Sequence, residues 1–201
     1  MAGSLSNLPL PLYPLQILYL NVITDVFPAL ALAIGPGSQG IMKQPPRPRA
    51  ESVLTRDHWK AVAGWAVLIA ICVLTALSIA FYPMGAESHR AVTISFLTLA
   101  FGKLWFVFNL RHPQSRLLDN EIVRNPYIAG SIGLCAGLLV AAVYLPGLSD
   151  LLRTVPPGPG GWLLIMAMSL VPFVCGQIWR RMGAGRKDAA ARPVHTETAK
   201  Y

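Results

Sequence analysis

Charged residues are scarce in this sequence. Only 13% of its 201 residues are Asp, Glu, Lys or Arg, while 54% are hydrophobic, and the mean hydropathy is +0.50. A soluble domain usually carries about 25% charged residues. Acidic residues are the scarcer sign, nine against seventeen basic ones, so the formal net charge is +8. Because the basic residues lie between apolar runs, they favour a membrane surface as partner rather than nucleic acid.

Cysteine is equally rare. Cys72, Cys135 and Cys175 lie in three different apolar runs, and none forms a CxxC pair. This spacing gives no disulfide framework and no zinc pattern, so the three thiols are predicted to be small buried core residues. The first fourteen residues have no basic segment and are rich in proline, so we expect no signal peptide.

Long apolar runs, by contrast, fill most of the chain. Five stretches have the roughly 20 apolar residues that a membrane-spanning helix needs: 15–34, 59–82, 91–110, 127–146 and 161–179. Lipid offers backbone amides no partner, so each must be a helix. The sequence therefore predicts an all-α, polytopic membrane bundle of five transmembrane helices within a domain at 1–182, followed by a disordered basic cytoplasmic tail at 183–201.

The positions of Lys and Arg predict the orientation of this bundle. Fourteen of the seventeen basic residues lie in segments 43–60, 111–124 and 180–200, which alternate spans place on one side. Only Arg90 and Arg153 lie on the other side. Since basic loops stay in the cytoplasm, the N-terminus is predicted outside and the C-terminus inside. We expect a multi-pass protein of the cell's inner (plasma) membrane.

The first span carries three polar side chains that lipid disfavours. Asn21 and Asp25 are four residues apart with Thr24 beside them, and Asp25 is the eleventh of twenty residues, near the midplane. An ionised carboxylate there costs a few kcal/mol unless it is paired, protonated or bound to a cation. Pro28 has no N–H and so frees the Thr24 carbonyl of an α-helix.

These oxygen atoms suit a hard cation. Carboxylate, amide, hydroxyl and carbonyl oxygens favour Ca²⁺, Na⁺, K⁺, Mg²⁺, Mn²⁺ or a proton over Cu⁺ or Zn²⁺. We therefore predict a partial cation site at Asn21, Thr24 and Asp25. The alternative is a structural polar cluster that joins helices through hydrogen bonds.

Lys103 is a second charge inside a span. It is the thirteenth residue from the outer end of 91–110, so its depth matches that of Asp25 within about 3 Å. One interpretation is a lysine that extends to the cytoplasmic interface, although Arg111 lies about 12 Å further along the helix. The other is an internal counter-ion that pairs with Asp25 when the cation is absent.

Residues 11–36, "PLYPLQILYLNVITDVFPALALAIGP", resemble the sixth transmembrane helix of P-type cation-transporting ATPases of the calcium-pump and sodium-pump class. The pattern in that class is close to P-x-Q-x-L-W-x-N-L-x-T-D-x-x-P-A-x-A-L. The matching residues are Pro14, Gln16, Leu18, Asn21, Thr24, Asp25, Pro28, Ala29, Ala31 and Leu32. The stretches "PPRPRAESVLTRDHW", "FLTLAFGKLWFVFNLR" and "RNPYIAG" agree. The resemblance thus extends over nearly the whole chain as helices six to ten of such a pump, with bacterial relatives the expected source.

This resemblance implies that Asn21, Thr24 and Asp25 belong to the pump's ion site, where the sixth helix is locally unwound. Two positions depart from the family pattern. Val26 replaces a frequent glycine, and a β-branched residue there opposes unwinding. Lys103 stands where bacterial relatives usually carry glutamine, and a cation at that position weakens the expectation of calcium specificity.

The sequence contains neither the family's phosphorylation motif D-K-T-G-T nor its T-G-E loop, nor the nucleotide-binding domain or helices one to five. We therefore expect no catalytic residue, no bound cofactor and no ATP hydrolysis by this chain alone. ATP and Mg²⁺ would act only in a complete pump, and the transported cation would be Ca²⁺, Mn²⁺, Na⁺, K⁺ or a proton.

Two functions follow as hypotheses. The first is the C-terminal membrane part of an ATP-driven cation pump, which holds part of the ion site and braces the transport helices. Its partners would be membrane lipid and the remaining helices and cytoplasmic domains of the pump. The second is a stand-alone membrane scaffold or binding protein derived from a truncated pump. A passive channel or secondary carrier is disfavoured because the five unlike spans show no paired halves.

Overall fold

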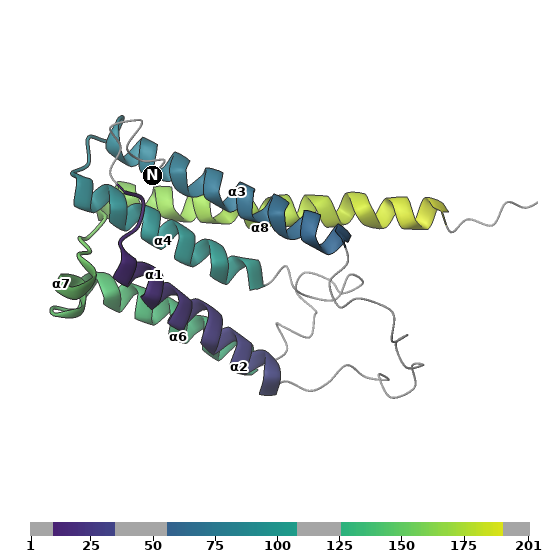
Figure 1. Cartoon of the computed structure of the whole chain (residues 1–201), viewed down its shortest axis with the longest axis horizontal. Coiled ribbons are helices and arrows are strands. Elements are labelled where there is room, and N and C mark those ends of the chain that lie inside the picture. Colours follow the sequence, from purple (N-terminus) through teal and green to yellow (C-terminus); the bar gives the residue numbers. More distant parts are fainter. Residues whose placement is uncertain (1–9, 35–55, 108–125, 191–201) are drawn as a thin grey trace, which may run out of the picture.

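The computed structural model describes residues 10–34, 56–107 and 126–190, and every regular element within these ranges is helical (Figure 1). In chain order the elements are α1 (Pro14–Leu20), η2 (Asn21–Val26), α2 (Phe27–Ile34), α3 (Arg56–Phe81), α4 (Ser88–Val107), α6 (Pro126–Tyr144), α7 (Leu148–Leu152) and α8 (Gly158–Ala190). Because α1, η2 and α2 follow one another without a break, five long helical stretches result. The predicted all-α membrane bundle is confirmed.

Helix α4 occupies the middle of this bundle. It packs against α3 and α8 on one side and contacts α6 and η2 on the other. The continuous α1–η2–α2 stretch runs alongside α6, and Figure 1 shows this pair as a second layer below α3, α4 and α8. The helix that carries Asp25 and the helix that carries Lys103 are therefore neighbours in space.

Four of the described helical stretches are long and apolar enough to cross a membrane: Pro14–Ala31, Trp59–Phe81, Pro126–Tyr144 and Gly158–Ile178. They coincide with four of the five predicted spans. Helix α4, the fifth, is not among them. It has a spanning length of 20 residues, but it carries Arg90 and Lys103, and the other helices cover most of it.

The ends of the helices agree with the predicted two-sided arrangement. The turn from α3 to α4 and the connection that holds α7 lie at one end of the bundle in Figure 1. The ends that lead to the basic segments 35–55 and 108–125 lie at the other, and those segments fall outside the described residues. Helix α8 continues to Ala190, past the boundary expected at 182, and the rest of the expected tail, 191–201, is not described.

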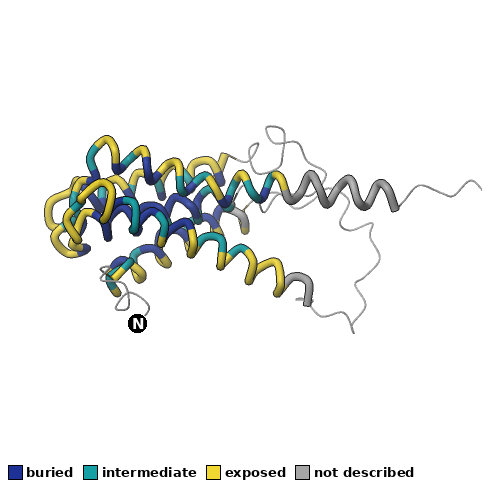
Figure 2. Tube along the Cα trace, turned by 90° about the horizontal axis from the view of Figure 1, so that it is seen from above, coloured by how far each residue is buried: buried dark blue, intermediate teal, exposed yellow. Residues whose placement is uncertain are grey.

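The core forms from apolar side chains of α4 and the small residues that surround it. Phe96, Leu97 and Ile94 are fully buried, and Ala76 and Ala142 of the neighbouring helices are fully buried beside them. Figure 2 shows the buried positions gathered in the middle of the bundle. Small residues allow membrane helices to approach closely, and such packing stabilises them where lipid is as apolar as the protein.

Three buried hydroxyl groups on α4 are satisfied within their own helix. Thr93, Ser95 and Thr98 each donate a hydrogen bond to the carbonyl four residues earlier, at 2.9, 3.1 and 2.7 Å. Side chains that bond in this way do not leave an unpaired donor in an apolar core. Their presence therefore lowers the hydropathy of α4 without a large cost in stability.

Gly161 lets the start of α8 approach α4. A Cβ atom at this position would lie 2.7 Å from the Pro157 Cβ and 3.2 Å from the Ile94 Cδ1. Since Ile94 is fully buried, it has little room to move away. The close contact between α4 and α8 thus depends on the absence of a side chain at residue 161.

We expect Gly161→Ala to destabilise the chain by about 1–3 kcal/mol, the usual cost of overpacking a core. The matched control is Gly130→Ala on α6, where an added Cβ meets nothing within 4 Å and alanine favours the helix. Thermal unfolding of the full chain in detergent measures both. An unchanged midpoint for Gly161→Ala would contradict the packing described for α8.

Candidate functional site

The α1–η2–α2 stretch has one buried stripe and one uncovered face. Gln16, Leu20, Ile23 and Thr24 are buried against the rest of the bundle, whereas Asp25 is exposed. On the uncovered face, Asn21 is also exposed, next to apolar residues such as Leu18 and Val22. Nothing else in the described part of the chain covers this face, so two of the three predicted ligands point away from the bundle's own core.

The polar segment adopts a π-helical turn. Residues Asn21–Val26 form η2, which interrupts the α-helix without breaking it. The family resemblance implies local unwinding here, and the structure instead shows a continuous helix with wider hydrogen-bond spacing. Val26 has a smaller range of backbone conformations than a glycine at this position would have, which disfavours an unwound segment. Single π turns within α-helices occur frequently at functional sites.

The Lys103 ammonium contacts the Asp25 carboxylate. Its Nζ lies 3.1 Å from Oδ1 and 3.2 Å from Oδ2, so it donates to both oxygens. The side chains are 30% exposed for Lys103 and 56% for Asp25, which places the pair at the edge between α4 and η2. An ion pair at mid-span offsets the cost that either charge alone would carry in lipid.

Thr24 lies behind this ion pair. Its hydroxyl is 2.8 Å from the Leu20 carbonyl and 3.2 Å from Asp25 Oδ1, and the residue is only 5% exposed. A hydroxyl has one proton, so it donates to one of these oxygens at a time. Thr24 therefore orients the carboxylate from the buried side, while Asn21 shares the uncovered face with Asp25.

This chain offers few cation ligands at the site. In residues 10–34, 56–107 and 126–190, no three His, Cys, Asp or Glu side chains lie close enough to hold a metal ion. Calcium takes six to eight oxygen ligands. Asn21, Thr24 and Asp25 supply fewer than that number, so these three side chains alone do not complete a calcium site.

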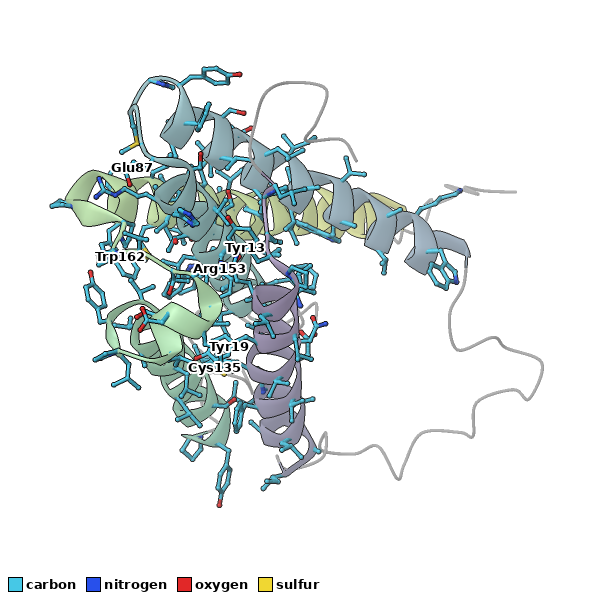
Figure 3. The ribbon with its side chains drawn as sticks, turned by 60° about the vertical axis from the view of Figure 1, so that its left-hand side comes forward. Tyr13, Tyr19, Glu87, Cys135, Arg153 and Trp162 are labelled. Atoms are coloured by element: carbon cyan, nitrogen blue, oxygen red, sulfur yellow. The ribbon has the colours of Figure 1, made fainter. Side chains whose placement is uncertain are left out.

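Gln16 fixes the N-terminal end of the same helix. Its fully buried side chain donates from Nε2 to the Leu152 carbonyl at 3.0 Å and accepts the Tyr13 N–H on Oε1 at 3.1 Å. The Arg153 guanidinium lies over the Tyr13 ring at 5.9 Å, and Figure 3 shows these two labelled side chains together. The segment that follows α7 is thereby tied to the first turn of α1.

The segment that follows α7 also reaches α4 and α6. The Val155 N–H donates to Thr93 Oγ1 at 3.0 Å, and the Thr154 hydroxyl donates to the Ala142 carbonyl. These bonds and those of Gln16 join three helices at one end of the bundle. The relative depth of Asp25 and Lys103 is therefore set by the hydrogen bonds of Gln16 and Thr93, which lie about two turns or more away along the same two helices.

Comparison with known proteins identifies the family of this bundle. The family described as "Cation transporting ATPase, C-terminus" matches residues 9–182. The chain belongs to this family. Its apolar helices and its match together make it a multi-pass membrane protein of the P-type cation ATPase class.

Individual relatives support the same assignment. A calcium-transporting ATPase of Bacillus subtilis is 35% identical over 166 residues, which are 82% of this chain and 18% of the relative. Calcium-transporting ATPase 1 of Saccharomyces cerevisiae is 26% identical over 90% of this chain and 19% of its own length. A P-type sodium-transporting ATPase of Toxoplasma gondii is 42% identical over 78 residues, 38% of this chain and 6% of the relative. The chain therefore spans less than a fifth of the length of these relatives.

Sequence reasoning missed the structural roles of Gln16 and Cys135. Gln16 was recognised only as a motif match, although a glutamine at the third position of a helix that opens with proline is a capping signal. Cys135 was predicted to be a small core residue; it is fully buried, but its thiol also donates a hydrogen bond to the Ile23 carbonyl. No pattern in the sequence indicates that second contact.

The ion pair predicts a specific pattern of stabilities. Asp25→Asn and Lys103→Met should each lower the free energy of unfolding, by up to about 2.5–3.5 kcal/mol, since each leaves one charge without its partner in lipid. The double variant should lose less than the sum of the two, because it leaves neither charge. Thermal unfolding of the full chain in lipid nanodiscs checks this cycle, and strictly additive losses would mean that the contact contributes nothing.

Proposed function

We propose that the chain is the C-terminal membrane part of an ATP-driven cation pump of the plasma membrane. In this function Asn21, Thr24 and Asp25 supply part of the intramembrane cation site. Lys103 acts as an internal counter-ion that occupies the carboxylate when the cation is absent. ATP hydrolysis belongs to domains outside this chain, which contains no phosphorylation motif.

The contact between Lys103 and Asp25 is the observation that carries this proposal. A mid-span carboxylate is costly in lipid, and intramembrane ionisable residues mark ion pathways by default. The ammonium binds both carboxylate oxygens at 3.1 and 3.2 Å, so a cation that uses Asp25 must first displace it. The pair thereby makes cation binding depend on the movement of one side chain.

The uncovered face of α1–η2–α2 supports the rest of the pump as partner. Asn21 and Asp25 are exposed there, and a polar pair open to lipid is unfavourable. The relatives are about five times longer than this chain. Helices from that additional length would cover the face and contribute the missing oxygen ligands.

The chemistry of the site supports a hard cation but does not choose among them. The Bacillus subtilis relative is described as calcium-transporting and the Toxoplasma gondii relative as sodium-transporting. Carboxylate, amide and hydroxyl oxygens accept either ion, and also Mn²⁺, K⁺ or a proton. Because Lys103 is itself positively charged, we expect this site to bind fewer positive charges than a site that has an uncharged residue at position 103.

A chimeric pump tests this function. The matching C-terminal region of the Bacillus subtilis calcium-transporting ATPase is replaced by residues 9–182, and ATP-dependent ion uptake is measured in membrane vesicles. We expect uptake by the chimera, and at least a tenfold loss with Asp25→Asn because the site loses its carboxylate. Lys103→Gln should change ion selectivity or the number of ions moved per ATP.

The control for the lysine is Lys60→Gln, the same chemical change in the first turns of α3, which should leave uptake unaltered. Full uptake with Asp25→Asn would contradict the proposed ligand. Unchanged selectivity and stoichiometry with Lys103→Gln would contradict the counter-ion role. A folded chimera without any uptake would favour the scaffold hypothesis instead.

A further inference from the structure

Pro28 deprives the Ile23 carbonyl of the backbone donor that a π-helix would supply. In a π-helix the N–H of residue i+5 donates to the carbonyl of residue i. For the Ile23 carbonyl that residue is Pro28, which has no N–H. Ile23 is 4% exposed, so water does not reach it easily, and an unpaired buried carbonyl costs about 1–3 kcal/mol.

A thiol from another helix fills this gap. Cys135 Sγ lies 3.1 Å from the Ile23 carbonyl oxygen, and Cys135 is fully buried. One turn further along α6, the Leu138 carbonyl accepts a hydrogen bond from the Tyr19 hydroxyl at 2.7 Å. Figure 3 shows Tyr19 and Cys135 side by side between α1 and α6. We call this reciprocal pair of bonds the α6 clasp.

We propose that Cys135 is a positioning residue for the ion site, and that its thiol replaces the absent Pro28 donor and thereby holds η2 in its π-helical form. This role deepens the proposed function, on which its relevance to transport rests. Successive residues of an α-helix are separated by about 100° around the axis. If η2 reverted to α-helix, a register change of one residue would turn Asp25 away from Lys103.

The clasp also limits which oxygens reach a cation. The Ile23 carbonyl is directed at α6 by its bond to Cys135, on the buried side of the helix, whereas Asp25 is on the uncovered face. The thiol therefore removes this carbonyl from the set of available ligands. The remaining oxygens of η2 and donors from elsewhere would then bind the cation.

Infrared spectroscopy of the S–H stretching band tests the bond itself. The full chain with Cys72→Ala and Cys175→Ala keeps Cys135 as its single thiol, and it is reconstituted in lipid. We expect a band at lower wavenumber than that of a thiol without an acceptor. Pro28→Ala supplies the missing N–H, so the band should move to higher wavenumber. A band at the free-thiol position, or one that Pro28→Ala leaves in place, would overturn the proposal.

A second measurement tests the positioning role without transport. Solid-state NMR of labelled chain measures the dipolar coupling between Asp25 Cγ and Lys103 Nζ, which are in contact. We expect Cys135→Val to lose this coupling and Cys135→Ser, which keeps a donor, to retain it. Cys72→Val is the matched control on α3 and should retain it.

The NMR results distinguish hydrogen bonding by the thiol from side-chain packing. Retained coupling in Cys135→Val would show that the thiol does not position Asp25. Loss in both Cys135→Val and Cys135→Ser would show that side-chain packing, and not hydrogen-bond donation, holds the turn. Because neither experiment measures transport, failure of the pump proposal would leave these outcomes unchanged.

Discussion

The ion pair between Asp25 and Lys103 is the interaction on which the other features of the site depend. A carboxylate and an ammonium in the middle of a span are each expensive in lipid, and contact reduces that cost. The contact at 3.1 Å requires α4 to lie beside η2 at matching depth. Helix α4 meets this requirement because it occupies the middle of the bundle, where α3 and α8 pack on it and the Val155 N–H bonds to Thr93 near its N-terminal end.

A proline three residues after the carboxylate gives the helix its local form. Pro28 has no N–H to donate, the segment before it forms a π turn, and the Cys135 thiol of α6 donates to the Ile23 carbonyl. The buried side of this helix therefore packs against and hydrogen-bonds to the bundle, while its uncovered face remains open to ligands. Thr24 joins the two, since its hydroxyl reaches both the Leu20 carbonyl and the carboxylate.

Sequence reasoning predicted the helices and the candidate residues from properties that are local to the chain. Apolar runs of spanning length located the five helical stretches, and counting residues along two of them placed Asp25 and Lys103 at similar depth. The π turn was not predicted. Pro28 marked the place where a carbonyl loses its donor, but a proline alone does not distinguish a π turn from an unwound segment, and Val26 argued against unwinding. The hydrogen bond from the Cys135 thiol could not be predicted, since it joins residues 112 positions apart in the sequence. Whether Asn21, Thr24 and Asp25 bind a cation stays a prediction.

The charges of the site constrain what can bind there. With Lys103 in contact, the single carboxylate is already neutralised. Two unit charges 4 Å apart interact by about 4 kcal/mol at an effective dielectric constant near 20, so a divalent ion beside the ammonium meets roughly twice that repulsion. The ammonium must move away before such an ion binds, and Asp25 then balances only half of the ion's charge. In the pump proposed above, a divalent cargo therefore requires a second carboxylate from outside this chain, whereas a monovalent ion or a proton does not.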